Sequence, residues 1–124
     1  MIRGIDNVGV AVSDLEASLG FYQTLGFESE YQDEFSAMVK AGTAHLYLFA
    51  TDNDASLSRS FDLEGNPRGI DHISLLVEDV DALCNELEAQ GVSPARPPQD
   101  YDWGARAACL YDPDGNCIWL LQRD

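Results

Sequence analysis

The sequence predicts an α+β fold in which two βαβββ modules form a curved mixed sheet around a cavity. The first observation is an internal repeat, because residues 4–15 (GIDNVGVAVSDL) and residues 69–80 (GIDHISLLVEDV) superimpose after a shift of 65 residues. The second is that this register continues without a gap to Gly26 and Gly91. The third is length. Two modules of about 60 residues are each marginal alone, so we expect them to share a core or to pair across a dimer.

The first module, residues 1–50, is expected to run strand–helix–strand–strand–strand. Residues 4–12 alternate, with valines on one face and small or polar side chains on the other. The stretch SDLE, which begins at Ser13, has the spacing of a capping box and predicts a helix that ends at Gly26. Three more strands are expected at residues 27–31, 35–40 and 45–49.

Residues 51–68 (TDNDASLSRSFDLEGNPR) are polar and rich in turn formers, which predicts a connection between the modules. The second module, residues 69–124, then repeats the cycle, with a strand, a helix that ends at Gly91 and a short strand near Val92. The prolines of PARPPQDYDWG predict an irregular loop. A hairpin is expected around the DPDG turn, from strands at 105–111 and 116–122. Residues 1–124 together are expected to form one domain.

The two faces of the repeated strands differ in character. The aliphatic face of each strand is expected to pack on the helix of its module. The opposite face carries Asn7 and Gly9 in the first copy, and His72 and Ser74 in the second. Small and polar residues make a poor core, so we expect this face to line a cavity. The most informative mismatch in the repeat is Asn7 against His72.

The chain is strongly acidic. Its 22 acidic and 7 basic residues give a net charge of −15 at pH 7, and this field argues against nucleic acid or an anionic membrane as a partner. Two interpretations stay open: attraction of a cationic ligand, or adaptation to high salt. No apolar run approaches the roughly 20 residues of a membrane span, and no signal-peptide pattern is present. We therefore expect a soluble, cytoplasmic protein.

The three cysteines, Cys84, Cys109 and Cys117, are odd in number and contain no Cys-x-x-Cys pair. This pattern argues against a disulfide framework or a zinc cluster, and predicts small buried apolar residues. The sequence also suggests no Ser-His-Asp or Cys-His arrangement and no glycine-rich phosphate loop.

The duplicated pattern, together with the segments FYQTLGF and LYDPDGNCIWLL, resembles the vicinal oxygen chelate superfamily. That superfamily contains glyoxalase I, extradiol dioxygenases, fosfomycin resistance enzymes and bleomycin resistance proteins. The resemblance covers nearly the whole chain. The segments EYQDEFSAMVKAGTAHLYLF and DWGARAACLYDPDGNCIWLLQRD look most like the bleomycin resistance branch. One scaffold hosts several chemistries, so the resemblance predicts the fold more strongly than the substrate.

In the enzymes of this superfamily, four side chains on the first and last strands of each module hold a divalent metal, and they are usually His or Glu. The resemblance places Asn7, Tyr47, His72 and Trp119 at these positions. Only the histidine is a good ligand, whereas the asparagine offers a weak carbonyl oxygen and the aromatic pair offers nothing useful at neutral pH. A catalytic metal normally keeps three protein ligands. We therefore expect no metal and no cofactor.

Aromatic rings in place of carboxylates would give a pocket that suits planar, partly cationic organic molecules. Bleomycin resistance proteins are similar, since they lack a metal and bind a cationic, flat-tailed drug in crevices at a dimer interface. The expected function is therefore a metal-free small-molecule-binding protein of the glyoxalase/bleomycin-resistance type, a homodimer that sequesters a cationic or aromatic antibiotic. The expected ligand-binding residues are Asn7, Phe35, Tyr47, Phe49, His72, Trp103 and Trp119.

Other readings stay open at this point. The alternative function is a metal-dependent glyoxalase-like lyase or dioxygenase with an unusual ligand set; the balance favours binding, and no catalytic residue is assigned. A sensor or accessory module is a third hypothesis. Tyr47, Phe49 and Trp119 could instead be core residues, and Trp103 could instead anchor its loop on the surface. Tyr101, beside Asp100 and Asp102, would suit a cationic ligand, but a solvated acidic loop is the simpler explanation. Arg106 is expected to pair with a neighbouring acid rather than to act in catalysis.

Overall fold

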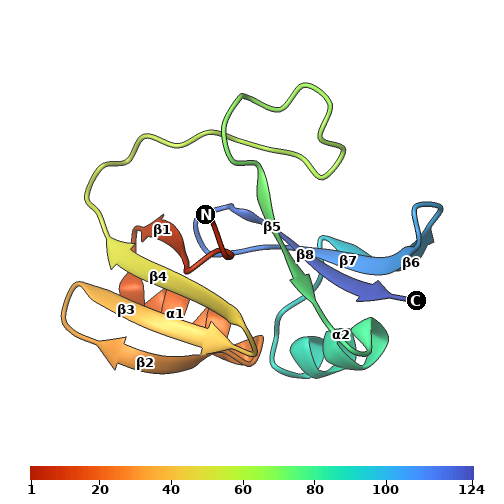
Figure 1. Cartoon of the computed structure of the whole chain (residues 1–124), viewed down its shortest axis with the longest axis horizontal. Coiled ribbons are helices and arrows are strands. Elements are labelled where there is room, and N and C mark those ends of the chain that lie inside the picture. Colours follow the sequence, from red (N-terminus) through yellow and green to blue (C-terminus); the bar gives the residue numbers. More distant parts are fainter. The chain divides into compact units, whose positions relative to one another are not determined.

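The computed structural model describes all of residues 1–124 and divides them into two compact units, Met1–Ala55 and Ser56–Asp124. Each unit contains one helix and one four-stranded sheet, and the strand orders are β1-β4-β3-β2 and β5-β8-β7-β6 (Figure 1). In each sheet the first strand of the unit pairs in parallel with the last, and the remaining pairs are antiparallel. The structure confirms the two βαβββ modules.

The first unit contains β1 (Val8–Val12), α1 (Leu15–Thr24), β2 (Glu28–Gln32), β3 (Ser36–Ala41) and β4 (Ala44–Ala50). Helix α1 lies behind this sheet in Figure 1 and contacts β4. Leu46 and Leu48 of β4 are buried, whereas Tyr47 and Phe49 between and beyond them are more exposed. Successive strand residues point to opposite faces, so this alternation separates the core face of the sheet from the other face.

The second unit contains β5 (His72–Leu76), α2 (Val80–Ala89), β6 (Arg96–Tyr101), β7 (Ala105–Tyr111) and β8 (Cys117–Arg123). Helix α2 contacts β6, β7 and β8, and it buries Val80, Cys84 and Leu87. The hairpin of β7 and β8 forms at the predicted DPDG turn. There Asp112 accepts hydrogen bonds from the backbone nitrogens of Asp114 and Asn116, at 3.0 and 2.8 Å.

Both helices begin with an aspartate cap, and for α1 this cap lies one residue beyond the predicted start of the capping box. Asp14, rather than Ser13, is the N-cap, and its Oδ1 accepts a hydrogen bond from Ala17 N at 3.2 Å. Asp79 caps α2 in the same way through Ala82 N, at 3.0 Å. A carboxylate satisfies a free N–H of the first turn and also interacts favourably with the helix dipole, so it competes well with the neighbouring serine.

Residues 96–101 form an edge strand, β6, where the prolines predicted an irregular loop. The register with β7 shifts between Arg96 and Gln99, which is where the two prolines lie. Proline has no N–H to donate, but an edge strand with an irregular register does not need every donor, and this explains why the strand forms. The strand predicted near Val92 is absent, because Val92 N instead donates to the last turn of α2.

The second half of the predicted connection folds onto the second unit, which begins at Ser56. Phe61 is only 5% exposed and belongs to a core cluster that also contains Trp119. The Asn66 side chain holds the backbone of Ser60 with two hydrogen bonds, at 2.9 Å to its nitrogen and 2.8 Å to its oxygen. This polar stretch is therefore more than a link, because part of it belongs to the packed structure.

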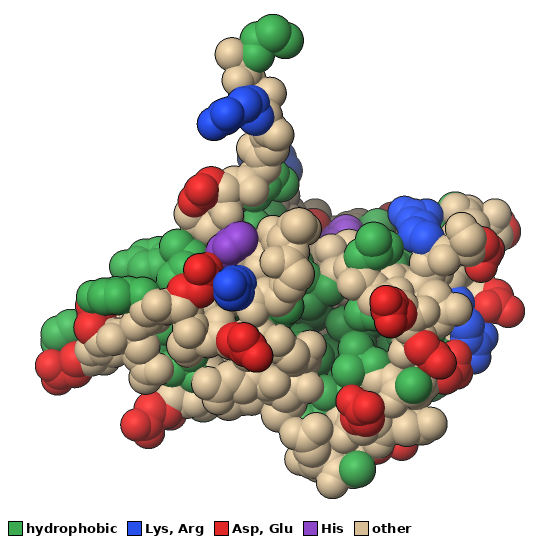
Figure 2. Space-filling model, turned by 60° about the horizontal axis from the view of Figure 1, so that its bottom comes forward, with side chains coloured by type: hydrophobic (Ala, Val, Ile, Leu, Met, Phe, Trp, Pro, Cys, Tyr) green, Lys and Arg blue, Asp and Glu red, His purple; other side chains and the backbone are tan.

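The three cysteines are free and buried, as predicted. Burial raises the pKa of the Cys109 thiol to about 12 and also raises the pKa values of Cys84 and Cys117, so all three are poor nucleophiles at neutral pH. Acidic side chains are spread over the face of the molecule shown in Figure 2 rather than gathered at one place. Neither helix has the length and apolar character needed to cross a bilayer.

Candidate functional site

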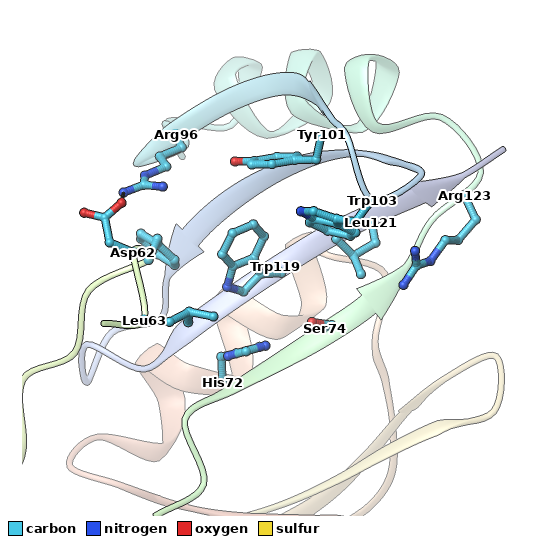
Figure 3. A pocket seen from close by; sticks show the side chains of 11 residues that line it. Asp62, Leu63, His72, Ser74, Arg96, Tyr101, Trp103, Trp119, Leu121 and Arg123 are labelled. Carbon is cyan, nitrogen blue, oxygen red and sulfur yellow. Dashed lines mark hydrogen bonds and ion pairs between the residues drawn. The ribbon is translucent and has the colours of Figure 1, made fainter. Parts of the chain in front are cut away.

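A pocket of about 460 Å³ lies within the second unit (Figure 3). Its volume falls within the range of small-molecule sites, which is roughly 300–1,000 Å³. The lining comes from the folded half of the connection, from β5, β6 and β8, and from the turn between β6 and β7. The lining residues are Phe61, Asp62, Leu63, His72, Ser74, Arg96, Tyr101, Trp103, Trp119, Leu121 and Arg123.

The floor of the pocket is one face of the β5–β8 pair. The two strands are parallel, and Ser74 lies opposite Trp119. Residues two apart in a strand share a face, so His72 joins Ser74 on β5 while Leu121 joins Trp119 on β8. This is the face that the sequence predicted to line a cavity. Leu120, between Trp119 and Leu121 on β8, belongs to the opposite face and is fully buried.

Four aromatic rings form the apolar wall, and Trp119 lies at their centre. Its ring centroid is 5.8 Å from that of Tyr101, 5.9 Å from that of Phe61 and 6.5 Å from that of Trp103. All three meet it at steep angles, which is a favoured geometry for aromatic pairs. Trp119 is 7% exposed and its indole Nε1 is buried with no hydrogen-bond partner. The N–H therefore remains an unused donor in the wall of the pocket.

Charged groups stand at two opposite ends of this wall in Figure 3. At one end Arg96 binds the Asp62 carboxylate at 2.5 Å, and this contact raises the pKa of Arg96. At the other end the guanidinium carbon of Arg123 lies over the Trp103 ring, 5.3 Å from its centroid. Arg123 forms no ion pair within the chain.

His72 is held in place by an acidic neighbour. Its Nδ1 lies 2.7 Å from Asp71 Oδ1, and Asp71 Oδ2 accepts a second hydrogen bond from Asn66 at 2.8 Å. The hydrogen bond from His72 and then that from Asn66 lower the pKa of Asp71, which is therefore a carboxylate and can only accept. Nδ1 must then carry the proton. In the neutral ring this leaves Nε2 free to accept a hydrogen bond or a proton.

The structure brings three of the seven predicted ligand-binding residues together in this pocket: His72, Trp103 and Trp119. The other four lie in the first unit. Asn7 precedes β1 and donates to Asp6, Phe35 precedes β3 and is 66% exposed, and Tyr47 and Phe49 stack on β4 with centroids 5.7 Å apart.

The sequence did not identify the rest of the lining. Phe61 and Leu63 lie in a stretch that looked like a polar link, although Phe61 is its only aromatic residue. Arg96 and Arg123 are two of only seven basic residues, and this rarity is a signal that singles them out. Tyr101 lines the pocket, where the expectation was a solvated loop. Arg106, by contrast, pairs with acids as predicted, at 2.7 Å from Asp81 and 3.2 Å from Asp100.

The four positions that the resemblance assigns to a metal do not fit one. The pairing register supports their equivalence, because Tyr47 lies opposite Gly9 on the first sheet as Trp119 lies opposite Ser74 on the second. The indole Nε1 of Trp119 carries a proton and cannot be a ligand, and His72 is the only good donor among the four. Within the structure no three His, Cys, Asp or Glu side chains come together in a group that could hold a metal ion.

Comparison with known proteins identifies the family of this chain. The chain is 23% identical over 111 residues to a bleomycin resistance protein of Klebsiella pneumoniae, covering 90% of this chain and 86% of that protein. It superimposes on a glyoxalase family protein from Enterococcus faecalis with a TM-score of 0.79 (24% identity; 96% of this chain and 97% of that one). It also superimposes on the fosfomycin resistance protein FosX from Listeria monocytogenes with a TM-score of 0.78 (20% identity; 100% and 96%), and both structural likenesses show the shared fold.

A family model matches residues 4–120, which span nearly all of both units. This match agrees with the resemblance to the vicinal oxygen chelate superfamily that the sequence showed. The chain therefore belongs to the Glyoxalase/Bleomycin resistance protein/Dioxygenase superfamily.

Proposed function

We propose that this protein is a small-molecule-binding protein of the glyoxalase/bleomycin-resistance type, which sequesters an aromatic ligand, such as an antibiotic, in the pocket of its second unit without a metal. The observation that carries the proposal is the cluster of Phe61, Tyr101, Trp103 and Trp119 around one pocket of ligand size. Each aromatic pair that a ligand ring adds contributes about 0.5–1.5 kcal/mol beyond the area it buries.

The polar groups of the pocket support binding more than covalent catalysis. The three thiols are buried with raised pKa values, so none supplies an activated nucleophile. His72 has an oriented Nε2 that suits a hydrogen bond from a ligand, and no cysteine lines the pocket. Sequestration requires only affinity and a slow release, and it needs no reacting group.

The alternative, a metal-dependent lyase or dioxygenase, would need ligands that Asn7, Tyr47, His72 and Trp119 do not supply. We therefore treat metal independence as part of the proposal and test it directly.

The protein is also proposed to act as a homodimer. The first unit exposes apolar surface at Phe35, Phe49 and Tyr31, with exposed fractions of 66%, 38% and 55%, and such surface favours a partner. Sedimentation velocity across a range of protein concentrations tests this, and a single monomer boundary at all concentrations would contradict it.

Binding is measured by titrating the purified chain with planar aromatic compounds, including a bleomycin-type glycopeptide. Both tryptophans of the chain line the pocket, so their fluorescence reports occupancy directly. We expect saturable quenching by at least one compound, unchanged by EDTA. No saturable signal with any compound, or loss of the signal in EDTA, would refute the proposal.

Variants at exposed apolar residues then locate the ligand. Trp103 is 48% exposed, so its replacement by alanine leaves the fold intact, and we expect Trp103→Ala to weaken binding about five- to tenfold. Leu57→Ala, at an exposed apolar residue of the second unit that does not line the pocket, is the control and should not change the affinity. A contribution of Asn7, Phe35, Tyr47 and Phe49 remains a prediction, which Phe35→Ala tests by calorimetry.

A further inference from the structure

We infer that the ligand of this pocket carries an anionic group, such as a carboxylate, next to a planar aromatic ring, and that Arg123 receives the anionic group. The inference rests on the proposed function and adds the chemical class of the ligand. It differs from the cationic ligand that the acidity of the chain suggested.

The charge of the pocket differs from the charge of the protein. The chain has 22 acidic and 7 basic residues, yet the pocket is lined by two arginines, Arg96 and Arg123, and by one acid, Asp62. With His72 neutral, the lining has a formal charge of +1 in a protein of −15. A random sample of this sequence would contain about three acids for each base. The pocket lining therefore contains more basic than acidic residues, which is the reverse of the whole chain.

The two arginines differ in whether a carboxylate already binds the guanidinium group. Arg96 is neutralised by Asp62 at 2.5 Å and also lies against the Phe61 ring, with its guanidinium carbon 5.8 Å from the centroid. Arg123 contacts only the Trp103 ring among charged or aromatic groups, at 5.3 Å, and it forms no ion pair. A guanidinium stacked on an indole keeps its N–H donors in its own plane, where they can bind a carboxylate with two parallel hydrogen bonds.

A second donor in the same pocket also lacks a partner. The Nε1–H of Trp119 is buried and unpaired, and in Figure 3 its nitrogen points to the side of the pocket where Leu63 and His72 lie. An unpaired buried donor is costly, so an acceptor on the ligand would be stabilising there. A ligand rich in acceptor oxygens therefore satisfies both Trp119 and Arg123. A cationic ligand would satisfy neither and would lie next to an unpaired positive charge.

Three probes with one ring system test the inference on the whole chain by isothermal titration: naphthalene-2-carboxylate, naphthalene-2-carboxamide and 2-naphthylmethylammonium. They are anionic, neutral and cationic at pH 7. We expect the carboxylate to bind about tenfold more tightly than the amide, as is typical of a hydrogen-bonded charge pair, and the ammonium to bind most weakly. Added salt should weaken binding of the carboxylate more than binding of the amide.

Arg123→Gln should weaken the carboxylate about tenfold and leave the amide within twofold. Arg68→Gln is the matched control, because it removes the same charge from an exposed arginine of the second unit that does not line the pocket. Equal affinities for the three probes, tightest binding of the ammonium, or no effect of Arg123→Gln would overturn the inference while leaving the proposed function intact. No binding of any probe, together with no quenching by the wider set of aromatic compounds, would overturn both.

Discussion

The two units share one backbone topology, but the equivalent face of the sheet is covered by other segments only in the second unit. Tyr47 and Trp119 occupy equivalent places, opposite Gly9 and Ser74 in the parallel strand pairs. Tyr47 stacks on Phe49 of its own strand and stays half-buried. Trp119 is instead surrounded by rings from other segments and is 7% exposed.

The difference comes from the chain before β5 and from the turn between β6 and β7. The chain before β5 folds back and places Phe61 and Leu63 over the sheet, whereas residues 1–7 before β1 are exposed throughout. The turn after β6 adds Trp103 on the other side. Duplication therefore supplies the sheet and the positions of its central aromatic residues. The chain before β5, which folds differently from the chain before β1, and the β6–β7 turn, which differs in sequence from the β2–β3 turn, enclose one of the two faces and build the pocket.

The largest effect should separate the two equivalent aromatic residues. Trp119→Ala removes a buried ring from the core cluster and should lower the free energy of unfolding by about 3–5 kcal/mol. Tyr47→Ala removes a ring that water already reaches, so about 1–2 kcal/mol is expected. Urea unfolding followed by circular dichroism measures both. Equal losses would mean that the two faces are equally enclosed in solution.

The next effect tests whether the folded half of the connection belongs to the second unit. Phe61→Ala should cost about 3 kcal/mol, because Phe61 is 5% exposed and touches Trp119 and Tyr111. Leu57→Ala, at a residue of the same stretch that is 62% exposed, should change stability by less than about 0.5 kcal/mol. The urea midpoints of the two variants provide the measurement. If the two substitutions cost the same, this stretch is only a link.

Much of this architecture could be predicted because strands and helices leave local patterns. The alternation in β1 separated the valines from the small and polar side chains, and Val10 and Val12 are indeed buried whereas Gly9 and Ala11 are exposed. The register of the repeat located the first strand and the helix of the second module, and the DPDG turn located its hairpin. For the same reason His72 could be assigned to the pocket face from the alternation of its strand, whereas Trp119 was placed there by the family resemblance.

The parts that could not be predicted depend on contacts between distant segments. Phe61 is buried only because β8 brings Trp119 beneath it, and nothing in its polar surroundings indicates this. The prolines of β6 resemble a loop locally, yet an edge position tolerates them. No local sequence pattern marks Arg123 as a pocket residue, because its position there depends on contact with Trp103 from another segment. The sequence therefore predicted the sheet face better than the walls that enclose it.

The aspartates of the repeat give a smaller and pH-dependent contrast. Asp71 accepts from His72 and Asn66, so Asp71→Asn should cost about 1–2 kcal/mol at pH 7. Its repeat counterpart Asp6 is exposed, and Asp6→Asn should cost less than about 0.5 kcal/mol. The measurement is the free energy of unfolding of the wild-type protein and of both variants between pH 2 and pH 7. This range spans the ordinary carboxyl pKa of about 3.9.

The sign of this pH dependence follows from the direction of the shift. Folding lowers the pKa of Asp71, so its contribution is fully present above the ordinary carboxyl value of about 3.9 and is lost as the pH falls through the lowered value. The gap between the wild-type protein and Asp71→Asn should therefore close in acid. A gap that widens in acid would contradict the assignment of Asp71 as the carboxylate that orients His72.

The smallest effect concerns the surface charges of the two units. Arg106 binds both carboxylate oxygens of Asp81, at 2.7 and 2.9 Å, and reaches Asp100 as well, so Arg106→Gln should lower the urea midpoint slightly. In the first unit Lys40 lies 4.0 Å from Glu30 with both side chains exposed, so Lys40→Gln should have no measurable effect. At 1 M salt, where the Debye length is about 3 Å, the effect of Arg106→Gln should shrink too. If it persists undiminished, the guanidinium of Arg106 stabilises the second unit through packing rather than charge.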